Sequence, residues 1–371
     1  MKTTKLFFTV LLLSAVTTVA GQSIIIDHHC AKLEPIPVWA LEQAAESLHI
    51  AYGHTSHGSQ LITGMTALAG QDTLLTGYKG DYYCWDYYPV PGENGSCIDI
   101  DDYFKPGDLG HNGDTQWAES TRDYLDNDPS STDINVVMWS WCGGCSDNTV
   151  EGINIYLNTM NQLELDYPGI RFVYMTGHRD IWSDDTLKRN NQLIRDYCVE
   201  NNKVLFDFAD IESYDPDGVY YEFANDNCDY YDEDMNKLGN WAIEWQDMHE
   251  EGVDWYQCSP AHTQALNGNL KAYASWWLWC RLAGWDGTVG TETPDSATDI
   301  LVFSRGKTIV LKGMPQGPIT VAVFDVSGKQ VLSKNMQGTT DALPSDLKTG
   351  VYFVRVQTDN GKYCTQKVII K

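Results

Sequence analysis

Short hydrophobic runs and longer amphipathic stretches alternate along most of the chain. The short runs, which we expect to be strands, lie at 49–52, 134–141, 170–176 and 204–208. The amphipathic stretches, which we expect to be helices, lie at 37–48, 117–125, 149–165, 186–200 and 263–282. Apolar strands that alternate with helices indicate a parallel sheet covered by helices on both faces. Residues 22–284 are therefore predicted to form one α/β domain.

After residue 284 the pattern changes to short strands without helices. Residues 285–300 are rich in Gly, Thr, Pro and Asp, which is typical of a linker. Hydrophobic runs follow at 309–311, 319–324, 330–332, 351–356 and 366–370, separated by turns such as Ser327-Gly328. Short strands at this spacing predict a small β-sandwich over residues 301–371.

The first 21 residues have the pattern of an export signal. A basic start, with Lys2 and Lys5, precedes an apolar run at 6–19 and the small residues Ala20-Gly21. This run is shorter than the roughly 20 apolar residues that a membrane-spanning helix takes. We therefore predict a signal peptide at 1–21, a protein exported from the cytoplasm, and no membrane insertion.

The chain is strongly acidic, with 51 Asp and Glu residues against 25 Lys and Arg residues and a net charge of −26. Such a charge repels nucleic acid and anionic membranes, which excludes nucleic acid as a partner. Carboxylates are densest at 99–102 and 207–254. These runs predict a solvated acidic face or, at Asp215-Pro-Asp-Gly218, a structural calcium site. We expect no other cofactor and no catalytic metal.

Ten cysteines, an even number, predict mainly structural disulfides in an exported chain. Cys84 and Cys97 flank a loop rich in Tyr, Trp, Pro and Gly, and we expect them to pair. The pattern leaves the other pairings open.

The segment with the most chemical content is residues 53–58, Gly-His-Thr-Ser-His-Gly, directly after the strand expected at 49–52. A glycine-flanked turn at the end of a strand exposes its hydroxyls, and a histidine can accept a hydroxyl proton near neutral pH. This turn is therefore a candidate for a hydrolytic nucleophile. The alternative is a polar loop that only joins a strand to a helix.

Three later segments are expected at the same edge of the sheet. This is the edge formed by the carboxyl ends of the parallel strands, where ligands bind. Gly110-His-Asn-Gly113 precedes the helix expected at 117–125. Gly143-Gly144, with Asn148 shortly after, follows the strand at 134–141. Cys258-Ser-Pro-Ala-His262 precedes the last helix.

In this order the four segments resemble the blocks of the SGNH (GDSL-like) hydrolase superfamily, over residues 45–284. The resemblance implies a flavodoxin-like three-layer α/β/α fold with a central parallel sheet. It also implies nucleophilic hydrolysis of an ester. The family's Gly-Asp-Ser reads Gly53-His54-Thr55 here, and although alignment favours Thr55 as the nucleophile, we favour Ser56.

The resemblance assigns roles to further residues. His262 would be the general base. The backbone amide of residue 56 would donate to the oxyanion. The other residues that would bind the oxyanion or the substrate are Gly113, Gly143, Asn148, His54 and His57. The acidic residue that the family places three positions before the base is Ser259 here, so a backbone carbonyl, Asp180 or Asp254 would orient His262.

The segment Thr176-Gly-His178-Arg179-Asp180 follows another expected strand. Arg179 could clamp a carboxylate of an acidic sugar with two hydrogen bonds, with His178 and Asp180 beside it. The alternative is an ion pair at the end of the strand.

Cys142-Gly-Gly-Cys145 competes with these assignments, because it is similar to the active-site motif of thioredoxin, in which a helix N-terminus activates the first cysteine. The proline-led loop that accompanies this motif is missing before Val204. A zinc site is disfavoured because one Cys-x-x-Cys is half a site. We favour structural disulfides for these two cysteines.

Three segments of the tail, Val323–Gly328, Leu347–Val354 and Lys367–Lys371, resemble the C-terminal sorting domain of the Bacteroidota type IX secretion system. The resemblance implies the type IX secretion machinery as a partner and a secreted or surface-attached protein. An accessory binding sandwich is the alternative.

Together these patterns predict a secreted serine esterase that deacetylates a polysaccharide. Aromatic residues at 82–88 suit stacking on sugar rings. One rival is a glycosidase or lyase on the same scaffold that uses Asp180, Asp114 or His262 as acid and base. Another rival is a glycan-binding protein without catalysis.

Overall fold

The structure is a computed structural model that describes residues 23–70, 81–88, 97–287, 301–305, 307–312, 317–325, 329–337, 342–358 and 363–370. The predicted signal peptide and most of the predicted linker lie outside the described residues. Both stay predictions.

A seven-stranded sheet forms the centre of the first domain, and every pair of neighbouring strands in it is parallel. Its spatial order is β1-β7-β6-β5-β2-β4-β3. The strands are β1 (Ile24–Ile26), β2 (His49–Gly53), β3 (Trp85–Asp86), β4 (Ile98–Asp102), β5 (Val136–Trp139), β6 (Arg171–Met175) and β7 (Val204–Phe206). The order β4-β2-β5-β6-β7 is the flavodoxin-like order 2-1-3-4-5. The predicted fold class is confirmed.

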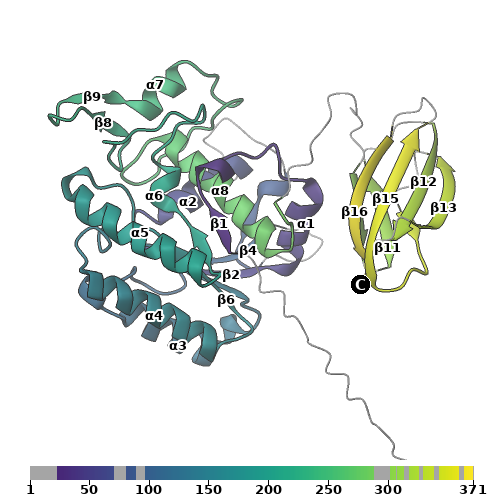
Figure 1. Cartoon of the computed structure of the whole chain (residues 1–371), viewed down its shortest axis with the longest axis horizontal. Helices are drawn as coiled ribbons and strands as arrows, with labels where there is room; N and C mark the ends of the chain where they lie inside the picture. The colour runs from purple at the N-terminus through teal and green to yellow at the C-terminus, as the bar shows by residue number, and fades with distance from the viewer. Residues whose placement is uncertain are drawn as a thin grey trace, which may run out of the picture.

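Helices cover both faces of this sheet (Figure 1). One face carries α1 (Val38–Ser47), α2 (Ser59–Ala69) and α8 (Ala265–Leu282), and the other carries α3 (Gln116–Asn127), α4 (Val150–Asp166) and α5 (Asp184–Glu200). Helix α8 is buried along nearly its whole length. A helix that is buried on all sides must find internal partners for its polar side chains, and Lys271 is one of them.

All nine elements expected between residues 37 and 282 are present, with ends shifted by a few residues. Strands β1, β3 and β4 and helix α2 are additional. Strand β4 reads Ile-Asp-Ile-Asp-Asp, which lacks the continuous apolar run of a central parallel strand. Asp99 inside it is buried because His49 pairs with its carboxylate at 2.7 Å.

A long insert between β7 and α8 was not predicted in detail. It contains α6 (Phe208–Ile211), β8 (Asp229–Tyr231), β9 (Lys237–Asn240) and α7 (Trp241–Asp247), and β8, β9 and α7 lie together at one end of the domain (Figure 1). The 3-10 helices of the domain are η1 (His28–Cys30), η2 (Asp81–Tyr83), η3 (His111–Gly113), η4 (Pro129–Ser131) and η5 (Ile181–Ser183).

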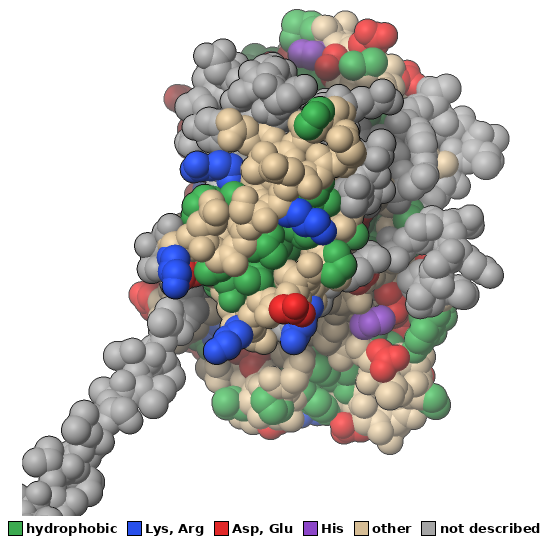
Figure 2. Space-filling model, turned by 90° about the vertical axis from the view of Figure 1, so that its right-hand side faces the viewer, with side chains coloured by type: hydrophobic (Ala, Val, Ile, Leu, Met, Phe, Trp, Pro, Cys, Tyr) green, Lys and Arg blue, Asp and Glu red, His purple; other side chains and the backbone are tan. Residues whose placement is uncertain are grey.

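The second unit is the predicted β-sandwich. One sheet has the order β10-β11-β14 and the other β13-β12-β15-β16, all antiparallel. The strands are β10 (Leu301–Arg305), β11 (Thr308–Lys312), β12 (Pro318–Asp325), β13 (Gln330–Gln337), β14 (Ala342–Pro344), β15 (Gly350–Thr358) and β16 (Tyr363–Ile370). In β15 the side chains of Tyr352, Val354 and Val356 are buried and those between them are exposed. Figure 2 shows Lys and Arg side chains beside hydrophobic ones on one face of the molecule.

Most cysteines of the described residues are free, which corrects the expectation of mainly structural disulfides. Cys84 and Cys97 form the expected disulfide. Seven further cysteines of the described residues carry free thiols, and six of these are buried. Buried cysteines behave as small hydrophobic side chains, so their even number in the sequence said nothing about pairing.

The calcium hypothesis at 215–218 is not supported by the contacts of its carboxylates. Asp215 accepts hydrogen bonds from the backbone amides of Asp217 and Val219 at 3.0 and 2.9 Å and from the Tyr221 hydroxyl. Asp217 accepts from the indole of Trp245. These carboxylates hold their own loop together.

Candidate active site

The candidate site lies where β2 and β5 end, which is the switch point of the flavodoxin-like strand order and the usual place for a ligand. Segments that are far apart in the sequence meet there. The turn after β2 contributes Ser56 and His57, the turn after β5 contributes Cys142, the insert contributes Asp226, and the loop before α8 contributes His262.

Ser56 and His262 are within hydrogen-bond reach. The Ser56 Oγ lies 2.9 Å from His262 Nε2, although the two residues are 206 positions apart. Ser56 is partly exposed and His262 is exposed. His262 has a positive φ of 64°, a conformation that is uncommon outside glycine and that often marks functional positions. This pair has the geometry of a nucleophile and its general base.

The turn that carries Ser56 is held by close packing. Tyr52 at the end of β2 donates its hydroxyl proton to the Gly58 carbonyl at 3.0 Å. A Cβ at position 58 would overlap the Ser140 hydroxyl and the His54 side chain. Only glycine fits there, which lets the chain return toward helix α2 immediately after Ser56.

The neighbouring hydroxyl of Thr55 points to a different partner. It donates to Asp108 Oδ2 at 3.0 Å. Burial raises the pKa of Asp108, and the hydrogen bond from Thr55 partly opposes this effect. No histidine of the described residues makes a hydrogen bond with this hydroxyl. The geometry therefore favours Ser56 over Thr55 as the nucleophile.

His54 is a buried structural residue. Its Nε2 lies 2.7 Å from Asp102 Oδ1, and its Nδ1 lies 2.9 Å from the Thr55 carbonyl oxygen. Both ring nitrogens thus contact the protein, and these contacts connect the turn to the end of β4. We therefore no longer assign substrate orientation to His54.

His57 connects two ionisable groups. Its Nδ1 lies 3.1 Å from Cys142 Sγ, and its Nε2 lies 3.1 Å from Asp226 Oδ2. Burial alone would lower the pKa of His57, but the hydrogen bonds to Asp226 and Cys142 outweigh it and raise the pKa to about 9. Because both nitrogens face acceptors, the doubly protonated ring satisfies both contacts.

The pKa values of the two partners of His57, Cys142 and Asp226, are both lowered. The hydrogen bond from His57 lowers the pKa of Cys142 to about 6, although burial opposes this change. Burial would raise the pKa of Asp226, but the hydrogen bond from His57 outweighs this effect and lowers it. The arrangement therefore favours a thiolate, an imidazolium and a carboxylate at neutral pH.

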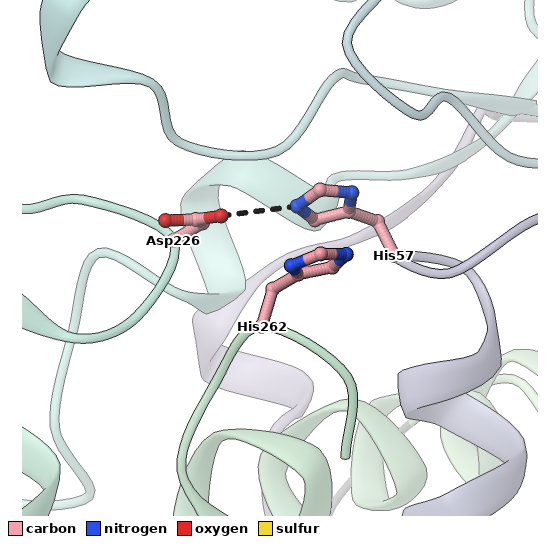
Figure 3. A group of neighbouring side chains, drawn as sticks. All are labelled: His57, Asp226 and His262. Atoms are coloured by element: carbon pink, nitrogen blue, oxygen red, sulfur yellow. Dashed lines mark hydrogen bonds and ion pairs between the residues drawn. The ribbon is translucent and has the colours of Figure 1, made fainter.

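Three histidine rings form a stack in the site. The ring of His57 is nearly parallel to that of His178, with centroids 3.6 Å apart, and to that of His262, with centroids 4.5 Å apart. Figure 3 shows His57 and His262 one above the other, with Asp226 joined to His57. Burial and the charge of His57 lower the pKa of His178, so His178 packs against His57 as a neutral ring.

No carboxylate orients His262 among the described residues. Its Nδ1 has no hydrogen-bond partner there, and its ring is held by the stack on His57. The two carboxylates that we considered for this role bind backbone amides instead, Asp180 that of Trp182 and Asp254 that of Glu250.

His57, Asp226 and His262 are also close enough to be considered for a metal, since their ligand atoms lie within 4.8 Å of one another. A histidine binds a metal along the lone pair in its ring plane, at about 2.0 Å for zinc. The rings of His57 and His262 are stacked, so their lone pairs do not converge on one point (Figure 3). The arrangement suits hydrogen bonding better than metal binding.

The residues expected to bind the oxyanion have other contacts. Asn148 is buried and donates its amide to the Gly110 carbonyl at 3.3 Å. Gly113 packs against helix α4, where an added Cβ would lie 2.8 Å from Ile155. Gly143 follows Cys142 directly and has a positive φ of 87°, which favours glycine. Of the three residues, Gly143 is the one next to Cys142, whose thiol contacts Ser56.

Arg179 has a structural role, which corrects the proposal of a carboxylate clamp. It is 5% exposed, and its guanidinium donates to the carbonyls of Ala224 and Glu222 and to the Ser213 hydroxyl. It also pairs with Asp184 at 3.6 Å. These bonds fasten the insert to the end of β6.

A buried charged network lies beneath the site. Lys271 Nζ lies 2.7 Å from Glu212 Oε2, and both side chains are almost completely buried. Lys271 also donates to Gln60 Oε1, whose amide donates to the Ala261 carbonyl next to His262. Glu212 accepts the backbone amide of Arg179, next to His178. The network thus ties the loops of His262 and His178 to the core.

Neither Cys142 nor Asp226 is expected from the sequence to take part in hydrolysis. Cys142 was considered for a disulfide with Cys145, but the two thiols are free and have different partners. The Cys145 thiol donates to Asn191 Oδ1, and burial raises its pKa to about 12. Asp226 belongs to an acidic run, so no local signal distinguished it from its neighbours.

Comparisons with known proteins identify the tail. Residues 305–371 match the family model of the secretion system C-terminal sorting domain. This domain indicates a secreted or cell-surface protein and an interaction with the type IX secretion machinery. No helix of the described residues is long and apolar enough to cross a membrane. No curated protein matches the sequence.

Three of the solved structures that resemble this chain are remote in sequence. A putative lipolytic protein of the G-D-S-L family from Desulfitobacterium hafniense is 10% identical and has a TM-score of 0.31; the match covers 62% of this chain and 98% of that one. An endo-β-1,4-mannanase from Cellulomonas fimi is 12% identical with a TM-score of 0.21, over 85% and 59% of the two chains. A Bacteroides vulgatus protein with an immunoglobulin-like β-sandwich is 17% identical with a TM-score of 0.19, over 21% and 88%. Scores this low carry no argument about function.

Proposed function

We propose that this secreted protein is a serine hydrolase that cleaves ester bonds, with acetylated polysaccharide as the substrate class. The observation that carries the proposal is the 2.9 Å contact between Ser56 Oγ and His262 Nε2 at the switch point of the sheet. A nucleophilic hydroxyl with a histidine in reach is the minimum that acyl transfer requires.

The mechanism follows from this pair. His262 takes the Ser56 proton as the oxygen attacks the ester carbonyl, and then protonates the leaving alcohol. Water, activated by the same ring, releases the acid and restores Ser56. The backbone amide of residue 56 is the first donor proposed for the oxyanion, and loss of one such donor typically costs about 3 kcal/mol.

A sugar polymer as substrate is supported by exposed aromatic side chains. Trp182, in η5 after β6, is 72% exposed, and Tyr82, Tyr87 and Tyr88 are exposed as well. Flat aromatic faces of this kind stack on sugar rings. The carboxylates considered for a glycosidase have other roles, since Asp180 caps η5 and Asp114 accepts the backbone amide of Gln116.

The test is acetate release from acetylated xylan and pectin by the full chain. We expect release that is lost in Ser56→Ala and retained in Ser47→Ala, an exposed serine at the end of α1. Loss in Thr55→Ala but not in Ser56→Ala would move the nucleophile to Thr55. Shortening of the polymer without acetate release would point to a glycosidase or lyase instead. Polymer binding that survives Ser56→Ala with His262→Ala, without any turnover, would point to a binding protein.

A further inference from the structure

The site contains a second nucleophile–base pair that ester hydrolysis by Ser56 does not use. Cys142 Sγ contacts His57 Nδ1 at 3.1 Å, and Asp226 holds the other nitrogen of the same ring at 3.1 Å. A nucleophile, a base within reach and a third group that orients the base are the signature of an activated nucleophile. Among the described residues, no third group orients His262 of the Ser56–His262 pair, whereas Asp226 orients His57 beside Cys142.

The thiol also differs from the other free cysteines in its access. Cys142 is the one partly exposed thiol among the seven free cysteines of the described residues, and the other six are buried. Its Sγ lies 3.3 Å from Ser56 Oγ, so both nucleophiles face the same place. A group that reaches Ser56 therefore also reaches Cys142.

The charges around the thiol favour its ionised form. His57 contacts it directly, and the Ser56 oxygen lies 3.3 Å from its sulfur. The ionisable groups of the neighbouring elements are Asp108, His178, Glu212, Asp226 and His262. Their negative members favour the imidazolium of His57, and this imidazolium is the closest charge to the sulfur. The thiolate is the nucleophilic form of cysteine.

We propose that Cys142, His57 and Asp226 form a second nucleophilic centre, in which the Cys142 thiolate accepts an acyl group from an activated ester. The S–C bond forms as Sγ attacks the carbonyl carbon, and the ester C–O bond breaks. The leaving oxygen takes its proton from the His57 imidazolium. Water then gives a proton to neutral His57 and attacks the thioester; the C–S bond breaks, and the acid and the thiolate–imidazolium pair are released. This proposal does not rest on Ser56 as a nucleophile.

Alkylation of the full chain by iodoacetamide tests the thiolate without any enzyme assay. The labelled peptides are quantified by mass spectrometry between about pH 5 and 9, and thiolate formation sets the rate. We expect labelling of Cys142 with an inflection near pH 6, the pKa of this thiol, while buried Cys198 stays unlabelled. In His57→Gln the inflection moves toward about 8.5, the value of an ordinary thiol. His49→Gln, at the opposite end of β2, leaves it unchanged.

Acylation is tested with p-nitrophenyl acetate on Ser56→Ala. We expect an acetyl group on Cys142 that hydroxylamine removes, and no adduct in Ser56→Ala combined with Cys142→Ser. An inflection in the ordinary thiol range in the wild type, or no acetyl group on Cys142 in Ser56→Ala, overturns the proposal and leaves the role of Ser56 intact. Full acetate release from polysaccharide by Ser56→Ala would overturn the role of Ser56 while the Cys142 adduct remains. Circular dichroism of each variant separates lost chemistry from lost folding.

Discussion

Asp226 Oδ2 accepts a hydrogen bond from His57 Nε2 at 3.1 Å, across 169 positions of sequence. This contact gives His57 a fixed orientation and a partner for its charge, which His262 does not have among the described residues. It also makes the insert after β7 part of the site, because Asp226 belongs to the insert and not to the sheet.

Asp226→Asn is expected to lower the pKa of His57. It should therefore also reduce the part of the pH dependence of stability that comes from His57. The raised pKa of His57 stabilises the fold fully below about 6.5, the pKa of an unfolded histidine, and this contribution is lost as pH rises through about 9. The free energy of unfolding should therefore differ most between wild type and Asp226→Asn near pH 6, and the difference should shrink toward pH 9. Urea titrations at several pH values measure it. A difference that grows with pH would contradict the assignment of the raised pKa to this contact.

His262→Ala is expected to reduce kcat for ester hydrolysis by about 10²- to 10⁴-fold, the usual contribution of a general base. The fold should be unaffected because His262 is exposed. His111→Ala is the matched control, since this exposed histidine pairs with Asp147 outside the Ser56–His262 pair. Steady-state kinetics with an acetylated substrate provide the measurement, and unchanged kcat in His262→Ala would reject it as the base.

Gly58→Ala is expected to destabilise the protein and disturb the site together. The added methyl group would overlap Ser140 and His54 and lie 2.8 Å from the Tyr52 hydroxyl. Overpacking of this kind costs about 1–3 kcal/mol. Gly169→Ala is the control, because nothing lies within 4 Å of a Cβ at that position, and this change should alter stability by less than about 1 kcal/mol. Equal effects of the two substitutions in thermal and urea unfolding would show that the turn is not tightly packed.

Lys271→Met should cost about 3–5 kcal/mol of stability, since it leaves the buried Glu212 carboxylate without its cation. Lys188→Met removes a partly exposed pair with Asp184 one helical turn away and should cost at most about 1 kcal/mol. Urea unfolding of both variants compares them directly. Glu212 also accepts a hydrogen bond from the backbone amide of Arg179, next to His178. Lys271→Met should therefore lower activity even at urea concentrations below its unfolding midpoint, where the variant is still folded. If both lysine variants lose the same stability, the buried network is not a major support of the loops.

The sequence predicted the scaffold better than the chemistry that it carries. Continuous apolar strands and amphipathic helices are periodic signals, so the sheet and its helices could be located, and the turn after β2 could be placed at the carboxyl edge. The partners of His57 could not. Asp226 lies in an acidic run without periodicity, and Cys142 was interpreted with Cys145 because the two are close in sequence. Which side chains meet depends on how the insert folds over the edge, and spacing along the chain does not show that.

The contacts that join the site connect residues far apart in the sequence. Ser56 and Cys142 are 86 positions apart, His57 and Asp226 are 169 apart, and Ser56 and His262 are 206 apart. Contacts of such long separation close late, because the chain must first lose the entropy of large loops. Helical signal should therefore return early when the unfolded protein is diluted from denaturant, and turnover should return in a slower phase. Regained activity would thus report completion of the whole first domain, including the insert, rather than formation of its sheet alone.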